Sequence, residues 1–181
     1  MSRTETLTRT MHDVGLAAWF GGSLMGAVGV NGAANDVDDP RQRARVASAG
    51  WDRWTPVNAA AIGAHVLGAL DLTRQNKGRV LTQQGAGKAA VVKAGLTAAA
   101  LGVTAYSRRL GRKVNDVPVA GATEPLPATP PEVAKAQRQL RQLQWLVPAL
   151  TGTMLGMNAL MGEQQRPKNV ARGLLRRKNA R

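Results

Sequence analysis

Two histidines are the side chains of this 181-residue sequence best suited to proton or metal chemistry. His65 lies within the apolar stretch 56–70, and an ionisable group at membrane depth is a default candidate for function. A proton relay, a haem ligand and a metal ligand are the chemistries open to it. The alternative is a purely structural role, in which a neutral histidine hydrogen-bonds a neighbouring helix carbonyl, Asn31 or Asn158. These three residues, His65, Asn31 and Asn158, form a candidate intramembrane polar site.

His12 stands beside Asp13, at the start of the first apolar stretch, and the two are typical of a helix start. If the next helix runs antiparallel, His65 should lie roughly 10 Å deeper than His12, at 1.5 Å of rise per residue. Joint ligation of one centre by both histidines is therefore not expected. Asp71 ends the second apolar stretch, where we expect it to pair with Arg74 or His12, or to be solvated.

Other catalytic patterns are missing from the sequence. Cysteine is absent, and so are a Ser-His-Asp set, a P-loop, a GxGxxG turn and a carboxylate pair within an apolar stretch. We therefore expect a protein other than an enzyme, with no catalytic residue, no cofactor and no metal site.

The formal net charge of +14 is compatible with nucleic-acid binding, with attraction to anionic lipid, or with the positive-inside bias of a membrane protein. The basic residues are spread over all the connections rather than gathered on one face. The tryptophans stand at the edges of apolar stretches, not as stacking platforms. Both observations disfavour a nucleic-acid partner.

The stretch 14–34 must position most of this chemistry, and it contains no charged residue. A helix of that length rises about 30 Å, the thickness of a bilayer's hydrocarbon core. A buried helix of a soluble protein and a signal peptide are the alternatives, and the acidic sequence that follows disfavours a signal peptide. Small residues recur along one face, where they permit close helix approach in a membrane: Gly15, Ala18, Gly22, Gly26, Gly29 and Ala33.

Three further apolar stretches follow, at 56–70, 89–107 and 145–162. The first is short for a span, and Trp51 and Trp54 precede it as interfacial aromatic residues. We expect a new helix to begin at Pro56, with Thr55 as its cap. The last stretch should be kinked by its internal proline. It contains a small-xxx-small pair suited to helix packing, Gly152 and Gly156.

The predicted layout is a polar N-terminus, 1–13; three membrane helices with basic loops, 14–107; a basic and Pro-rich linker, 108–131; an amphipathic lead-in and last membrane helix, 132–162; and a basic tail, 163–181. The basic tail favours cytoplasmic termini. The basic cluster after Tyr106 opposes that orientation, because with four spans it would lie outside. Three spans would remove the conflict by placing the termini on opposite sides.

Two resemblances accompany these patterns. Residues 12–22, written H-x6-W-x-G-G, resemble the opening helix of small multi-span proteins related to the copper-resistance D group. That resemblance implies a helical membrane bundle and copper handling, but this sequence lacks the paired histidines and Met clusters that copper needs. The segments AAWFGGSLMGAVGVNGAA, WTPVNAAAIGAH, LQWLVPALTG and GEQQRP resemble a group of uncharacterised actinobacterial membrane proteins. This second resemblance spans most of the chain and implies no activity.

The sequence thus predicts an all-α integral membrane helix bundle, with four transmembrane helices packed through Ala/Gly faces. The expected role is a structural or partner-binding membrane component. The alternatives are a small transporter or channel with His65 as its titrating group, and a soluble basic protein. The expected partners are the lipid bilayer, anionic lipid at the basic tail, and a second copy or another membrane protein. The residues expected to pack helices are Gly15, Gly22, Gly26, Gly29, Gly152 and Gly156.

Overall fold

The computed structural model describes residues 3–75, 77, 86–115 and 123–164. This part of the chain is all-helical and contains no strand, as the sequence predicts. Its elements are α1 (Arg3–Met25), η1 (Gly26–Val30), α2 (Asn31–Asn35), α3 (Pro40–Gln75), α5 (Ala86–Asn115) and α6 (Pro131–Gln164). The segment η1 is a single π-helical turn, and it joins α1 and α2 into one continuous rod.

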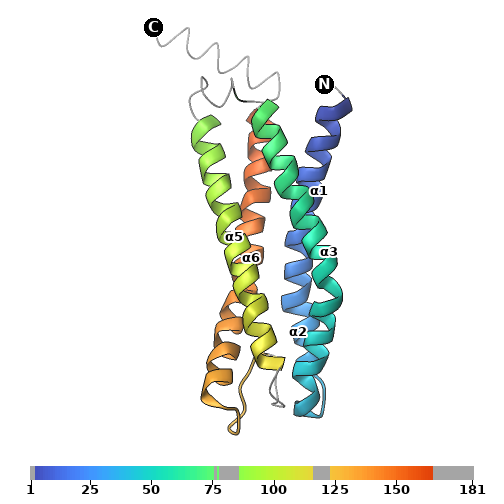
Figure 1. Ribbon diagram of the computed structural model, residues 1–181, viewed down its shortest axis with the longest axis vertical. Helices are drawn as coiled ribbons and strands as arrows, with labels where there is room; N and C mark the ends of the chain where they lie inside the picture. The colour runs from blue at the N-terminus through green and yellow to red at the C-terminus, as the bar shows by residue number, and fades with distance from the viewer. Residues whose placement is uncertain (1–2, 76, 78–85, 116–122, 165–181) are drawn as a thin grey trace.

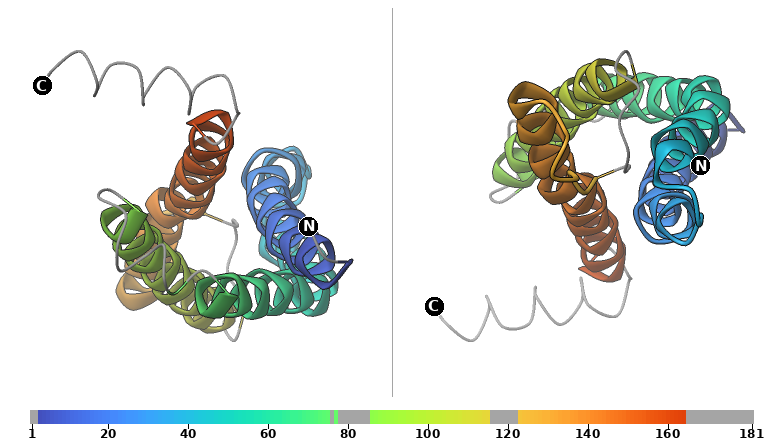
Figure 2. Two further views of the ribbon diagram at one scale, coloured as in Figure 1. Left: turned by 90° about the horizontal axis from the view of Figure 1, so that it is seen from above. Right: turned by 90° about the horizontal axis from the view of Figure 1, so that it is seen from below.

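Four long helical rods lie side by side, and α1 begins at the end of the molecule where α6 finishes (Figure 1). The first rod packs along α3, and α5 packs along α6. These two hairpins meet mainly between α1 and α6, whereas the backbones of α3 and α5 approach each other at few positions. Figure 2 views the four rods from above and from below. The backbones are therefore closer along the α1–α6 seam than along the α3–α5 seam, which side chains bridge.

Helix α3 begins much earlier than the sequence predicts. Asp39 caps it: the Arg41 backbone N–H donates to Asp39 Oδ1 at 3.0 Å, and Pro40 occupies the first turn. The prediction that a helix starts at Pro56 is wrong, because α3 runs unbroken through that residue. Instead of capping a helix, the Thr55 hydroxyl donates to the Trp51 carbonyl oxygen at 2.8 Å.

Tertiary packing explains why α3 continues through Pro56. A proline inside a helix removes one backbone hydrogen bond. Here the turns on both sides of Pro56 are held by contacts with the first rod, where the rings of Trp51 and Trp54 rest on glycines. Burial of two large aromatic rings outweighs the lost bond.

The interior of the bundle is built from small residues and a few large ones. Leu16 and Trp19 of α1 are completely buried, and so is Met154 of α6. They form one cluster with Ala100 of α5 and Val147 of α6. A second cluster, centred on Leu110, holds the opposite ends of α5 and α6 together with α3.

The predicted linker and tail are described only in part. Helix α5 continues to Asn115, so the first residues of the predicted linker are helical. Residues 116–122 and the tail residues 165–181 lie outside the described residues. The predicted lead-in and last span form one helix, α6.

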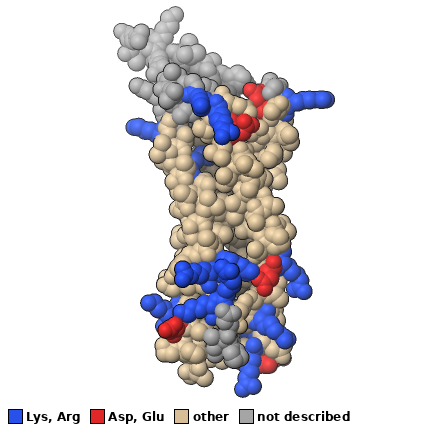
Figure 3. Space-filling view, viewed as in Figure 1, with Lys and Arg blue, Asp and Glu red and all other residues tan. Residues whose placement is uncertain are grey.

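Two segments, Arg3–Asn35 and Gly87–Asn115, are long and apolar enough to cross a membrane, which is compatible with a membrane location. On the face shown in Figure 3, charged side chains gather toward the two ends of the bundle, and uncharged residues form its middle. Charge is thus segregated along the helix axes.

Candidate functional site

The histidines meet in a polar cluster near the end where α1 begins, which we call the histidine cluster (His12, Asp13, His65, Thr97, Met154 and Asn158). His65 Nδ1 lies 3.2 Å from the backbone carbonyl oxygen of His12. A carbonyl can only accept, so this nitrogen carries the proton and Nε2 of the neutral ring is the acceptor. That second nitrogen lies 3.5 Å from the hydroxyl of Thr97.

The cluster extends to α6 on both sides of the histidine pair. The Thr97 hydroxyl also lies 3.2 Å from Met154 Sδ, and its single proton is donated either to this sulfur or to His65 Nε2. His12 Nδ1 lies 2.7 Å from Asp13 Oδ1, and the same carboxylate oxygen accepts a hydrogen bond of 3.2 Å from Asn158. All four long helices therefore contribute to one network.

The expected separation of the two histidines is wrong: their ring centroids are 4.5 Å apart. The cause is the close approach of α1 and α3. A Cβ on Gly68 would lie 2.8 Å from the backbone nitrogen of His12, and one on Gly15 would lie 2.7 Å from that of His65. Two glycines thus bring one histidine of each helix into contact.

Asp71 also has partners other than those expected. The Thr8 hydroxyl donates to Asp71 Oδ2 at 2.7 Å, and Gln75 donates to the same oxygen at 2.7 Å. No pairing of Asp71 with Arg74 or His12 is seen among the described residues. The described residues also hold no group of three or more His, Cys, Asp or Glu side chains placed for a metal ion.

The three residues expected to form one polar site lie in two places. His65 and Asn158 belong to the histidine cluster, although they do not bond each other directly. Asn31 lies in α2, far along the bundle. Its amide donates to Gln144 at 2.8 Å, and its oxygen accepts from Trp51 Nε1 at 2.9 Å.

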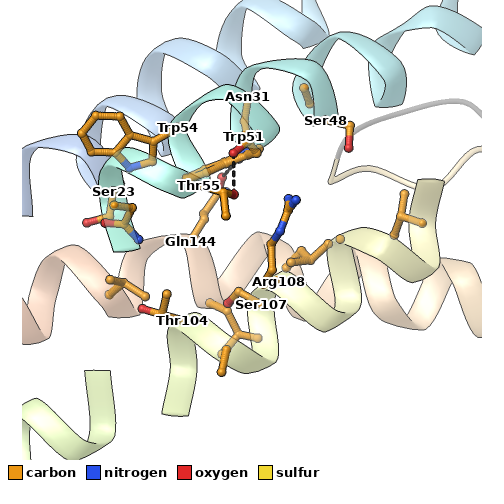
Figure 4. Close-up of a pocket in the computed structure, with 18 of the residues that line it drawn as sticks. Ser23, Asn31, Ser48, Trp51, Trp54, Thr55, Thr104, Ser107, Arg108 and Gln144 are labelled. Atoms are coloured by element: carbon orange, nitrogen blue, oxygen red, sulfur yellow. Dashed lines mark hydrogen bonds between the residues drawn. The ribbon is translucent and has the colours of Figure 1, made fainter. Parts of the chain in front are cut away.

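Asn31 lines an interior cavity of about 380 Å³ that the sequence did not indicate. Figure 4 shows labelled side chains from all four rods around it. Its walls are mainly apolar and include Ile62, Leu101, Leu143 and Val147. Three of the chain's four tryptophans line it: Trp19, Trp51 and Trp54.

Five buried side-chain atoms around this cavity have no hydrogen-bond partner among the described residues. They are the indole nitrogens of Trp19 and Trp54, the amide oxygen of Asn58, and the hydroxyls of Thr104 and Ser107. We call this set the unpaired polar set. Buried polar atoms without a partner are costly and uncommon, so a cluster of five around one cavity needs an explanation.

The cavity opens sideways, between α3 and α5. Thr55 and Ala59 of α3 and Ala105 of α5 line it, and all three are exposed. Arg108 lies at the same seam, where its guanidinium pairs with Asp52. At this seam α3 and α5 are joined by side chains and make few backbone contacts.

The glycines expected to pack helices lie in different surroundings. A Cβ on Gly22 or Gly26 would overlap the ring of Trp54 or Trp51, respectively, so both glycines admit these rings. A Cβ on Gly152 would lie 3.0 Å from the Phe20 ring. A Cβ on Gly29 would lie nearest to Met25 of its own rod, and one on Gly156 would face open space.

Sequence reasoning found the histidines and most of the close-packed glycines but missed the cavity. One available indication was the spacing of Thr104 and Ser107, which places two hydroxyls on one face of a helix near the end of its apolar stretch. Comparisons with known proteins add no further guide, since no family model, curated protein or solved structure matches this chain.

Proposed function

We propose that this chain is an integral membrane protein of four helical spans with a binding role rather than a catalytic one. The observation that carries the proposal is the amount of apolar side-chain surface that the long helices expose. Large hydrophobic residues are exposed on every long helix, among them Val14, Val28, Val57, Leu67 and Leu160. Exposed apolar surface on this scale marks a membrane or a partner interface.

The burial pattern supports a membrane over a soluble fold. A core helix of a soluble protein is mostly buried, but only 6 % of the most apolar part of Gly87–Asn115 is buried within the bundle. The corresponding figure for Arg3–Asn35 is 33 %. These helices therefore present apolar surface outward, as lipid-facing helices do.

Helices α3 and α6 support the count of four spans. Residues 54–70 of α3 and 142–162 of α6 contain no charged side chain. Each packs beside a rod that is long and apolar enough to cross: α3 beside α1, and α6 beside both α1 and α5. If α1 and α5 cross the bilayer, their antiparallel partners lie at the same depth.

Membrane extraction tests the proposal directly. We expect the full chain to stay in the membrane pellet after a high-salt wash followed by alkaline carbonate. The salt wash matters because the net charge of +14 could hold a peripheral protein on anionic lipid. Release by either wash would overturn the proposal.

Reporter fusions at residues 45, 80, 120 and 181 test the number of spans. Four spans with cytoplasmic termini place 80 and 181 in the cytoplasm and 45 and 120 outside. If 45, 80 and 120 share one side, α3 and α5 do not cross, and the chain is a membrane-anchored helical adaptor. In either arrangement, anionic lipid at the basic tail and a second copy or another membrane protein are the partners we propose.

A small transporter or channel with His65 as its titrating group is the second candidate. The observation in its favour is the line of polar contacts from Asp13 through His12 and His65 to Thr97, which passes from α1 through α3 to α5. Proteoliposomes carrying the wild type and His65→Ala should then differ in pH-dependent ion flux. Unaltered flux in the variant would remove this candidate.

A further inference from the structure

The unpaired polar set indicates which hydrogen-bonding groups a ligand of the cavity must carry. An indole N–H can donate but not accept, so Trp19 and Trp54 each need an acceptor atom. Trp19 is completely buried, so its nitrogen is closed off from bulk water, and a ligand atom reaches it only when neighbouring side chains shift. The hydroxyls of Thr104 and Ser107 can also donate. The unmet demand is therefore mainly for acceptor oxygens.

The cavity walls and the nearby charged residues limit the polarity and the charge of the ligand. The walls are mainly apolar, so most of the ligand must be apolar too. The cation nearest the cavity, Arg108, is already paired with Asp52. An anionic head group would have to compete with that carboxylate, so a neutral head group fits better.

The volume of the cavity and the position of its opening limit the size of the ligand and its route of entry. A volume of about 380 Å³ is at the small end of the range for ligand pockets, roughly 300–1,000 Å³. The opening lies at exposed residues of α3 and α5, on the side of the bundle rather than at its end. In a chain that spans the membrane as proposed above, a side opening faces lipid, and a lipid-soluble molecule can enter through it.

We propose that this cavity binds a neutral, lipid-soluble molecule that carries carbonyl oxygens on a compact apolar body, as quinones and aromatic ketones do. Once the lining side chains shift to expose these groups, its oxygens accept hydrogen bonds from the indole N–H groups and from the hydroxyls of Thr104 and Ser107. Its apolar body lies against the rings of Trp51 and Trp54 and the aliphatic walls. This inference rests on the proposed membrane location, because the ligand arrives from the bilayer.

Tryptophan fluorescence reports on the cavity, because Trp145 is the only tryptophan outside its lining and is half exposed. A Trp145→Phe background leaves emission from the cavity alone. The full chain in phospholipid nanodiscs is titrated with a decyl-substituted benzoquinone, which quenches indoles on contact. We expect saturable quenching.

Two comparisons separate binding from partition into the bilayer. Ala105→Leu places bulk at the opening, and Ala99→Leu makes the same change at an exposed position of α5 outside the lining. We expect saturable quenching to be lost only in the first variant. Combining Thr104→Val with Ser107→Ala should raise the half-saturating concentration about tenfold, through the loss of two hydrogen bonds. Thermal midpoints show that each variant is folded.

Three outcomes would overturn the proposal: quenching that rises linearly without saturation, equal quenching in Ala105→Leu and Ala99→Leu, or no effect of the hydroxyl variants. A parallel titration uses a phospholipid with brominated acyl chains. If that lipid alone gives saturable quenching sensitive to Ala105→Leu, a bilayer lipid fills the cavity and the compact carbonyl ligand is wrong. A chain that resists alkaline extraction but shows no saturable quenching refutes the ligand and leaves the membrane function standing.

Discussion

The bundle contains two groups of buried polar side chains that are built from similar residues but differ in one respect. In the histidine cluster, polar groups from different helices reach one another: His65 bonds both α1 and α5, and Asp13 bonds α6. In the unpaired polar set, five atoms of similar types find no partner among the described residues. Paired polar groups rigidify a core, whereas unpaired ones leave a cost that the ligand proposed above would relieve.

The spacing of the helices explains the difference. At the histidine cluster, glycines bring the backbones of α1 and α3 close enough for side chain to meet backbone. Around the cavity, tryptophan rings occupy the space between those rods, and α3 and α5 make few backbone contacts. The polar atoms there are too far apart to satisfy one another, and the space between them remains open.

The largest expected effect comes from breaking the close approach itself. In Gly15→Ala, the new Cβ would lie 2.5 Å from the Ala61 carbonyl oxygen and 2.7 Å from the His65 backbone nitrogen, so α1 and α3 must separate. We expect a loss of about 2–3 kcal/mol in unfolding free energy, as for overpacked cores. Thermal midpoints in detergent measure it.

Gly21→Ala is the matched control on the same helix. Its Cβ would meet nothing within 4 Å, so the change should stabilise the protein by up to about 1 kcal/mol through helix propensity. Equal midpoints for the two variants would contradict the role of the glycine contact.

A somewhat smaller effect separates the two clusters. His65→Ala removes a buried ring that contacts His12 and bonds two other groups, and should cost about 2 kcal/mol. Asn58→Ala removes an amide whose oxygen has no partner, and should cost about 1 kcal/mol or less. Chemical denaturation in mixed micelles compares the two variants, and a larger loss for Asn58→Ala would reverse our interpretation of the clusters.

The sharpest comparison uses one residue type on one helix, two turns apart. Thr97→Val removes the hydroxyl beside His65 Nε2 and should cost about 1–2 kcal/mol, because a buried nitrogen loses its partner. Thr104→Val removes a hydroxyl that has no partner, and should be neutral or slightly stabilising without ligand. Thermal midpoints of the ligand-free protein measure both changes, and similar losses in the two variants would show that the Thr104 hydroxyl is bonded.

The sequence predicts much of the fold and only part of the site. Uncharged stretches and small residues at helical spacing identify the helices, because length and periodicity are local properties. The continuity of α3 through Pro56 was missed, because packing of Trp51 and Trp54 on another rod decides it. Similarly, the contact between His12 and His65 depends on how far α3 extends before Pro56, since that sets the register of the hairpin.

The cavity could not be predicted from the pattern of any one helix. Its unpaired polar set draws Trp19 from α1, Trp54 and Asn58 from α3, and Thr104 and Ser107 from α5. Thr104 and Ser107 share one face of α5, but nothing in the stretches of the other three residues indicates that they meet there. Whether their polar atoms meet depends on the distance between α3 and α5, which contacts elsewhere in the bundle set.

The smallest expected effect on stability comes from Asp39, which belongs to neither cluster. Asp39 is fully exposed, and the N–H of Arg41, with a second bond from Gln42, holds the pKa of this carboxyl below its ordinary value of 3.8. A lowered pKa in the folded state means that the ionised group stabilises folding above its unfolded pKa. This contribution is lost as the pH falls through the folded value.

Asp39→Ala should therefore lower the thermal midpoint slightly near pH 6, by less than any other destabilising change above, because exposed contacts compete with water. Wild type and variant should converge as the pH drops below 3.8. Asp38→Ala is the control, since Asp38 is exposed and precedes the capping position. A difference that persists in acid would assign the effect to the start of the helix rather than to the carboxylate.

A difference between wild type and Asp39→Ala as large as that of Thr97→Val would mean that pairing in the histidine cluster contributes no more than a surface hydrogen bond. The contrast between the two clusters would then lose its energetic basis.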